Sequence, residues 1–210
     1  MKSLNIIISS ILIYCLSTGC SISKSLRVEN GQTSLEDKST VNGSIYVGDH
    51  VDISGDCKTI NGKINIGNHS NVQNLESING GIRIGREVNV NGRVRIINGS
   101  IDIDPGTRIA GDISTVNGRM TLEGTIAESN LRIHNGTIEL YDRSIVAGDI
   151  IIERINGTYP LQKKVRIEVS DGSTVEGNII VDSFETDVTV YLLQGGKVKG
   201  HIDGACVVER

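Results

Sequence analysis

The residue types that most often carry catalysis or metal binding are few in this 210-residue sequence and are spread along it. The four histidines stand apart, at His50, His69, His134 and His201. We assign them to different repeats and different columns of the chain, so they predict no metal cluster. Asp102 and Asp104 precede a Pro-Gly pair and match a calcium loop weakly, but strand alternation points Asp102 outward. No catalytic order of Ser, His and Asp and no phosphate-binding loop is present, so we expect no enzyme activity and no cofactor.

The residues before Cys20 resemble a substrate for lipid attachment. Met1-Lys2 is a positive start, and Ile6 to Leu16 is an apolar run too short to span a bilayer. Leu16-Ser17-Thr18-Gly19-Cys20 then resembles the lipobox of bacterial lipoproteins. The resemblance implies a signal peptide over residues 1–19 and a short tether over 20–25. It also implies that Cys20 receives diacylglycerol and an acyl chain such as palmitate.

Two locations follow from alternative interpretations of this leader. Lipidation predicts a protein anchored in the bacterial cell envelope, at the outer membrane in a Gram-negative cell. Several acyl chains anchor a protein stably where one chain does not. The alternative is an ordinary secretory signal in which Cys20 has no role.

A nine-residue phrase recurs along the chain, and Thr40 to Gly48 is its first copy. Each copy contains an Asn-Gly pair, and successive in-register pairs begin 18 to 21 residues apart. A period near 19 residues is too short for a repeat of two helices. The pairs are Asn42-Gly43, Asn61-Gly62, Asn79-Gly80, Asn98-Gly99, Asn117-Gly118, Asn135-Gly136 and Asn156-Gly157.

Apolar and polar residues alternate around each pair. The third and fifth residues after each asparagine are apolar, as Ile101 and Ile103 are after Asn98, and the residue between them is mostly polar. This alternation predicts a strand with one buried face. The residues one and four positions before the asparagine, here Ile97 and Val94, form two more apolar columns, with His134 before Asn135 as the exception. We expect all four columns in a common interior, which requires the repeats to stack.

The predicted fold is all-β: a single-chain β-solenoid, or β-helix, of about nine coils with about 19 residues per coil. At about 4.8 Å per coil it forms a rod roughly 40 Å long. Left-handed β-helices favour a strict six-residue period, which this repeat breaks, so we expect a right-handed helix. Asparagine and glycine tolerate positive φ, so each pair is expected to form a tight corner. The asparagines would then stack as a hydrogen-bonded ladder.

The expected β-helix domain covers residues 26–210. Its alternation is already present at Leu26-Arg27-Val28. A second pattern, Gly-x-x-Val-x-Gly-x-Ile, recurs toward the C-terminus, as in Gly172 to Ile179 and Gly195 to Ile202. The coils therefore continue past the last Asn-Gly pair. The stretch from Thr158 to Lys164 is the expected protruding loop.

Two further cysteines lie in the expected domain. Cys57 occupies a column filled elsewhere by Leu75 and Val94, so we expect a small core residue. At least six coils, or about 30 Å of rod, separate Cys57 from Cys206, whereas a disulfide needs Cα atoms about 4.4–6.8 Å apart. A bond between them within one chain is excluded. Cys206 is then either free or bonded to a second chain.

The Gly-x-x-Val-x-Gly-x-Ile units, in a chain with one Phe and no Trp, resemble the bactofilins. These bacterial polymer-forming cytoskeletal proteins have a right-handed β-helix fold. The resemblance covers most of the chain after Cys20 as a style of repeat, and it implies end-to-end assembly into filaments. Bactofilins are cytoplasmic, whereas this leader predicts export. The Thr40 to Ile45 phrase is also similar to repeats of adhesin-type bacterial β-solenoids.

The sequence therefore favours a non-catalytic, lipid-anchored envelope β-solenoid that acts as a structural, self-assembling or adhesion scaffold. Its net charge of −4 lacks the basic excess of a nucleic-acid-binding surface. The expected partners are the membrane, a second copy at the solenoid ends, where strand edges are unpaired, and an envelope protein or polysaccharide. The alternative function is a polysaccharide-binding or polysaccharide-cleaving β-helix. Such a protein would be expected to stack sugar rings on aromatic side chains, and this sequence has one Phe and no Trp. A left-handed β-helix acyltransferase would need a catalytic histidine.

Overall fold

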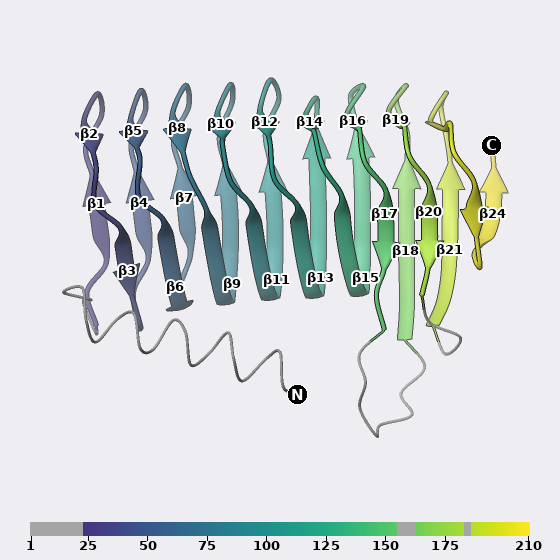
Figure 1. Ribbon diagram of the computed structural model, residues 1–210, viewed down its shortest axis with the longest axis horizontal. Coiled ribbons are helices and arrows are strands. Elements are labelled where there is room, and N and C mark those ends of the chain that lie inside the picture. Colours follow the sequence, from purple (N-terminus) through teal and green to yellow (C-terminus); the bar gives the residue numbers. More distant parts are fainter. Residues whose placement is uncertain (1–22, 155–162, 183–185) are drawn as a thin grey trace.

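The fold is a stack of β-coils wound around one long axis (Figure 1). The computed structural model describes residues 23–154, 163–182 and 186–210. These residues form 24 strands, and none of them belongs to a helix that could cross a bilayer. In Figure 1 the nearer strands descend and the fainter, more distant strands ascend as the chain advances from left to right. The winding is therefore right-handed, as expected.

Two parallel sheets make up the coils. The larger has 15 strands and forms the two long walls, and the smaller has nine two-residue strands, one for each coil. The predicted count of about nine coils is confirmed for the described residues. The smaller sheet consists of β2 (Thr33–Ser34), β5 (Asp52–Ile53), β8 (Asn71–Val72), β10 (Asn89–Val90), β12 (Arg108–Ile109), β14 (Ile126–Ala127), β16 (Ile145–Val146), β19 (Thr174–Val175) and β22 (Lys197–Val198).

In the middle of the stack, one long strand forms both walls of a coil. β9, β11, β13 and β15 each run for 10 or 11 residues through the Asn-Gly pair and bend at the lower edge of Figure 1. Toward both ends the two walls are separate strands. The larger sheet consists of β1 (Leu26–Val28), β3 (Lys38–Thr40), β4 (Ile45–Val47), β6 (Cys57–Asn61), β7 (Ile64–Ile66), β9 (Leu75–Ile84), β11 (Val94–Ile103), β13 (Ile113–Glu123), β15 (Leu131–Tyr141), β17 (Ile150–Ile152), β18 (Lys163–Val169), β20 (Ile179–Val181), β21 (Thr186–Leu192), β23 (Ile202–Asp203) and β24 (Cys206–Glu209).

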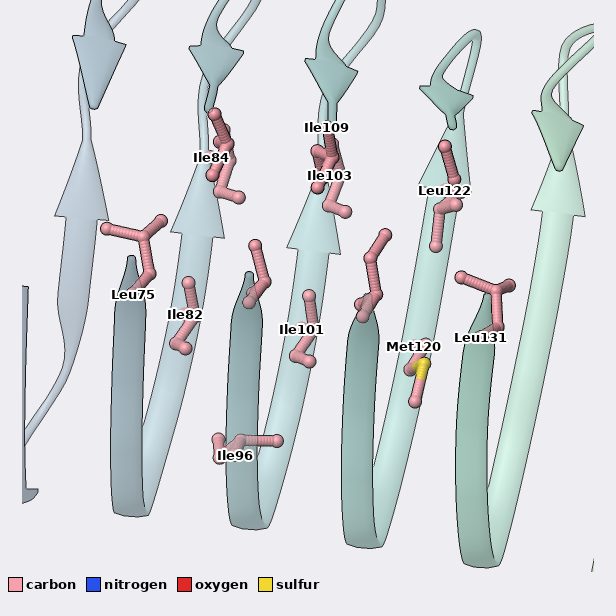
Figure 2. Packing of buried hydrophobic residues seen from close by; sticks show 14 of the residues in the cluster. Leu75, Ile82, Ile84, Ile96, Ile101, Ile103, Ile109, Met120, Leu122 and Leu131 are labelled. Carbon is pink, nitrogen blue, oxygen red and sulfur yellow. The ribbon is translucent and has the colours of Figure 1, made fainter. Parts of the chain in front are cut away.

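The interior is a set of columns of stacked β-branched and leucine side chains. Ile82 pairs in register with Ile101, which pairs with Met120, and all three are fully buried. Figure 2 shows these side chains pointing into the space between the walls. The columns predicted three and five residues after each asparagine are thereby confirmed. Branched side chains stack well on a pleated surface, so this core needs almost no aromatic residues.

The column immediately before the asparagines does not join that interior, which corrects our expectation. Ile78 and Ile97, with Ile60 and Val116 packed against them, form a separate apolar cluster. Period two explains the result, because Val94 and Ile96 are both core residues and the next residue, Ile97, must face the other side of the strand. Positions one and four before the asparagine are an odd number of residues apart and cannot share a face.

The last predicted repeat is also out of register. Ile152 lies four positions before Asn156, so the repeat predicts it in the column of Leu131. β17 instead pairs Ile150 with Leu131 and Ile152 with Ile133. β18 then places Val165 opposite Gly136, so Lys164 and not Asn156 takes the position after Asn135. Asn156-Gly157 and most of the loop expected over Thr158 to Lys164 lie outside the described residues.

Candidate functional site

Asparagines at the wall-to-wall bend form the predicted ladder. Each amide Nδ2 donates a hydrogen bond to the Oδ1 atom of the asparagine one coil earlier. The N···O distances are 2.8 Å from Asn61 to Asn42, 3.0 Å from Asn79 to Asn61, 2.9 Å from Asn98 to Asn79, 3.2 Å from Asn117 to Asn98 and 3.4 Å from Asn135 to Asn117. The side chains are exposed, so the ladder ties successive coils together along one edge of the rod.

The glycines of this bend are required for a different reason from the one expected. None of the ladder asparagines has positive φ, and among the paired glycines that the structure describes only Gly80, Gly99 and Gly136 do. In Gly62, Gly80, Gly99, Gly118 and Gly136, a Cβ atom would overlap the carbonyl oxygen of the glycine one coil earlier. Glycine recurs here because the backbones of neighbouring coils approach too closely for any side chain.

The prediction that all four histidines occupy different columns is wrong for His50 and His69. His50 and His69 occupy the same turn in adjacent coils, and their rings stack with centroids 4.8 Å apart. His69 Nδ1 lies 3.2 Å from a carboxylate oxygen of Glu87 in the next coil. Their spacing of 19 residues was the signal that placed them in one column. The described residues nonetheless contain no group of three or more His, Cys, Asp or Glu side chains arranged to hold a metal ion.

His134 and His201 lie elsewhere. His134 is half-buried, and its Nδ1 atom lies 2.5 Å from the carbonyl oxygen of Glu153. His201 is exposed in the last coil. Neither is close enough to the stacked pair to complete a site.

Asp102 points outward, as predicted, and takes part in local contacts. Its Oδ2 atom accepts a hydrogen bond of 2.9 Å from Ser100 Oγ. Arg83, one coil earlier, stands in register with Asp102, but its guanidinium lies 3.4 Å from Asp104. An arginine beside one of the two carboxylates disfavours a calcium ion there.

Polar side chains stand in two of the core columns at the N-terminal end, while Leu26 and Val28 of β1 continue two others. Lys38 stands in register with the fully buried Cys57, and its ammonium lies 3.8 Å from Glu36. Ser34 stands in register with Ile53. These residues lie 19 positions before apolar core residues, which is the signal that the sequence analysis missed.

The last described coil, residues 197–209, leaves the core open. Val207 stands in register with Val190, yet Val190 is fully buried and Val207 is 41% exposed. Val198 and Ile202 are partly buried against the same core. A hollow of about 510 Å³ lies beside this coil, between Gly195-Gly196 and Glu209-Arg210.

Both described cysteines are free. Cys57 is buried in the core, as predicted, and burial raises the pKa of its thiol to about 12. Cys206 is exposed on β24 in the last coil. Cys20 lies outside the described residues.

Comparison of the chain with protein-family models, with curated proteins and with solved structures found no match. Functional assignment therefore rests on the coils themselves. Their two most distinctive surfaces are the asparagine ladder and the open C-terminal end.

Proposed function

We propose that this protein is a non-catalytic, lipid-anchored β-solenoid of the bacterial cell envelope that associates with a second copy through its C-terminal coil, residues 197–209. The observation that supports the association is the exposure of Val207 above the buried Val190. Val198, Ile202 and Val207 continue the columns of Val175, Ile179 and Val190 to this end. Glu209 is the one polar residue among these columns, in register with Leu192. Burying Val207 and its neighbours against another copy would extend the core.

The difference between the two ends favours a dimer over a filament. A filament needs the C-terminal end of one copy to stack on the N-terminal end of the next. The N-terminal end places Lys38 and Ser34 in two of its core columns, beside the apolar Leu26 and Val28. Burying the Lys38 ammonium group against an apolar end is costly. Two C-terminal ends can meet around a two-fold axis with Val198, Ile202 and Val207 on both sides, provided that Glu209 lies at the rim of the contact.

The association should be weak in solution. One coil end offers less area than a stable interface of about 1,600 Å² in total requires. Anchoring both copies in one membrane through Cys20 would raise their effective concentration. The resemblance of the leader to bacterial lipoproteins supports such an anchor.

Sedimentation velocity over a concentration series tests the association. The sample is the chain from Ser21 onward, which contains the whole described fold, under reducing conditions. We expect a reversible monomer–dimer equilibrium that Val207→Asp abolishes. Leu35→Asp, at an apolar residue that is 79% exposed near the other end, is the matched control and should leave it unchanged. A strict monomer at all concentrations, or growth into filaments, would overturn the proposal of a C-terminal dimer.

A separate experiment tests the anchor. The full chain is expressed in a Gram-negative host with an alkyne-tagged palmitate, and the membrane fraction is examined for label. We expect labelled protein in the membrane fraction, and loss of both label and membrane retention in Cys20→Ser. Unlabelled, secreted protein would show that the leader is an ordinary secretory signal.

A further inference from the structure

A second surface feature lies on the wall that follows the asparagine bend. A hollow of about 240 Å³ spans three successive coils and is bordered by Lys63, Asn65, Gly81, Arg83, Ser100 and Asp102. Arg83 stands in register with Asn65 on one side and Asp102 on the other. Ile82 also borders the hollow, but only through its backbone. Its side chain points into the core (Figure 2).

The hollow exists because Gly81 has no side chain. In neighbouring coils the same column holds Ser44, Lys63, Ser100, Arg119 and Thr137. A Cβ atom on Gly81 would meet nothing closer than the Ser100 oxygens at 3.6 Å, an ordinary contact, and Gly81 does not have positive φ. Neither the backbone nor the packing demands glycine here, in contrast to the adjacent Gly80.

The groups around the hollow offer two cations and several hydrogen-bonding atoms. Among the described residues no carboxylate lies within salt-bridge distance of the Lys63 ammonium. The Arg83 side chain is 67% exposed and makes only the 3.4 Å contact with Asp104. Asp102 keeps a free carboxylate oxygen, because Ser100 donates to the other.

This combination matches an acidic sugar better than other small molecules. A carboxylate can bind between the ammonium of Lys63 and the guanidinium of Arg83. Ring hydroxyls can donate to Asp102 and pair with the amide of Asn65. The volume is below the roughly 300–1,000 Å³ of a drug-sized site, which suits one ring.

We propose that the hollow around Gly81 binds a single uronic-acid-type unit of an acidic envelope polysaccharide. The carboxylate is held by Lys63 and Arg83, and the hydroxyls by Asn65, Ser100 and Asp102. No aromatic side chain borders the hollow, so the affinity for one unit is in the millimolar range. The site requires neither dimerisation nor lipidation.

NMR titration of the ¹⁵N-labelled chain from Ser21 onward tests this site. The ligand is trigalacturonic acid, and its methyl ester is the uncharged control. We expect amide shifts confined to the three segments around residues 63–65, 81–83 and 100–102. The ester should shift none of them.

Three variants distinguish a specific binding site from nonspecific electrostatic attraction to the basic side chains. Lys63→Ala removes one charge-assisted contact and should weaken binding about tenfold. Gly81→Gln fills the hollow and should abolish binding. Arg119→Ala removes a cation from the same column three coils away from Lys63, one coil beyond Ser100 and outside the hollow, and should leave the affinity unchanged.

Three results would overturn the proposal. Equal losses in Lys63→Ala and Arg119→Ala would indicate unspecific attraction to a basic surface. Absence of shifts with the acid, in protein that is folded, would exclude the ligand. Tighter binding of an N-acetylated dipeptide carboxylate at the same amides would assign the hollow to a peptide.

Discussion

Gly80 and Gly99 occupy the same bend in adjacent coils, and the carbonyl oxygen of Gly80 fills the place that a Cβ atom on Gly99 would take. Gly99 also has a φ of 144°, a region that side chains rarely adopt. The recurring glycine is thus fixed by the approach of one coil to the next. This contact sets how closely the coils stack at the asparagine edge.

Gly99→Ala should therefore destabilise the fold strongly. Overpacking against backbone, which cannot move aside without breaking the coil register, costs about 2–4 kcal/mol when combined with the strained φ. Gly81→Ala, one residue after the equivalent bend in the preceding coil, is the control and should change stability by less than about 1 kcal/mol. Urea unfolding followed by circular dichroism measures both. Similar losses in the two variants would show that stacking at the bend does not require glycine.

The sequence predicted the coils well because a period of 19 residues places equivalent residues in register. Ile101 and Met120 could be assigned to one column by counting alone. The predicted position of Ile97 was wrong because its column was assigned to the core from its apolar character alone. Ile96, the residue before it, already faces the core, so Ile97 must face the other side of the strand. The alternation of faces along a strand, which can be read from the sequence, places Ile97 outside the core.

Other features depended on distances that a sequence does not contain. The stacking of His50 on His69 could be predicted from their spacing. The need for glycine at position 99, where a Cβ atom would overlap the Gly80 carbonyl oxygen, could not. An Asn-Gly pair is equally well explained by a tight turn. The hollow at Gly81 was equally hidden, since only the distances around Gly81 show that a side chain would fit there. Repeats show which residues align, and the backbone geometry shows why each is needed.

Removing one asparagine from the middle of the ladder should cost two hydrogen bonds. Asn98 donates to Asn79 and accepts from Asn117, so Asn98→Ala should lower the free energy of unfolding by roughly 1–2 kcal/mol. Asn91 also precedes a glycine and is exposed, and Asn91→Ala should change stability by less than about 0.5 kcal/mol. Urea unfolding of both variants provides the comparison. Equal stabilities would mean that solvent replaces the ladder bonds without loss.

The two thiols should react at very different rates. With a pKa of about 12, only about one Cys57 in 10,000 is a thiolate at pH 8, and its side chain is out of reach. Cys206 is exposed. A maleimide should therefore modify one thiol per chain in the folded protein from Ser21 onward, and none in Cys206→Ser. Rapid modification of two thiols would show that the coil around Cys57 opens readily.

Asp112 lies in a polar network that links three coils, because its partner Arg132 also contacts Glu153 in the coil beyond, at 3.0 Å. Its Oδ1 atom accepts hydrogen bonds from Ser129 Oγ at 2.5 Å and from the backbone N–H of Asn130 at 3.1 Å. Its Oδ2 atom accepts from Arg132 Nε at 2.9 Å. Burial opposes ionisation of this carboxyl, but the bonds from Ser129 and Arg132 outweigh it and lower the pKa below the ordinary 3.8.

This pKa shift predicts a pH-dependent contribution to stability. A carboxyl whose pKa is lower in the folded state stabilises the fold at pH values above about 3.8, its pKa when unfolded. The contribution is lost as the pH falls through the lower, folded-state value. Asp112→Asn should therefore be less stable than the parent chain at pH 7, by roughly 1 kcal/mol because the network is partly exposed to solvent. The difference should shrink between pH 4 and pH 2, as protonation removes the same charge from the parent. Thermal unfolding across this pH range measures it, with the exposed Glu29→Gln as control. A difference that stays constant down to pH 2 would mean that the shape of the side chain, and not its charge, supports the network.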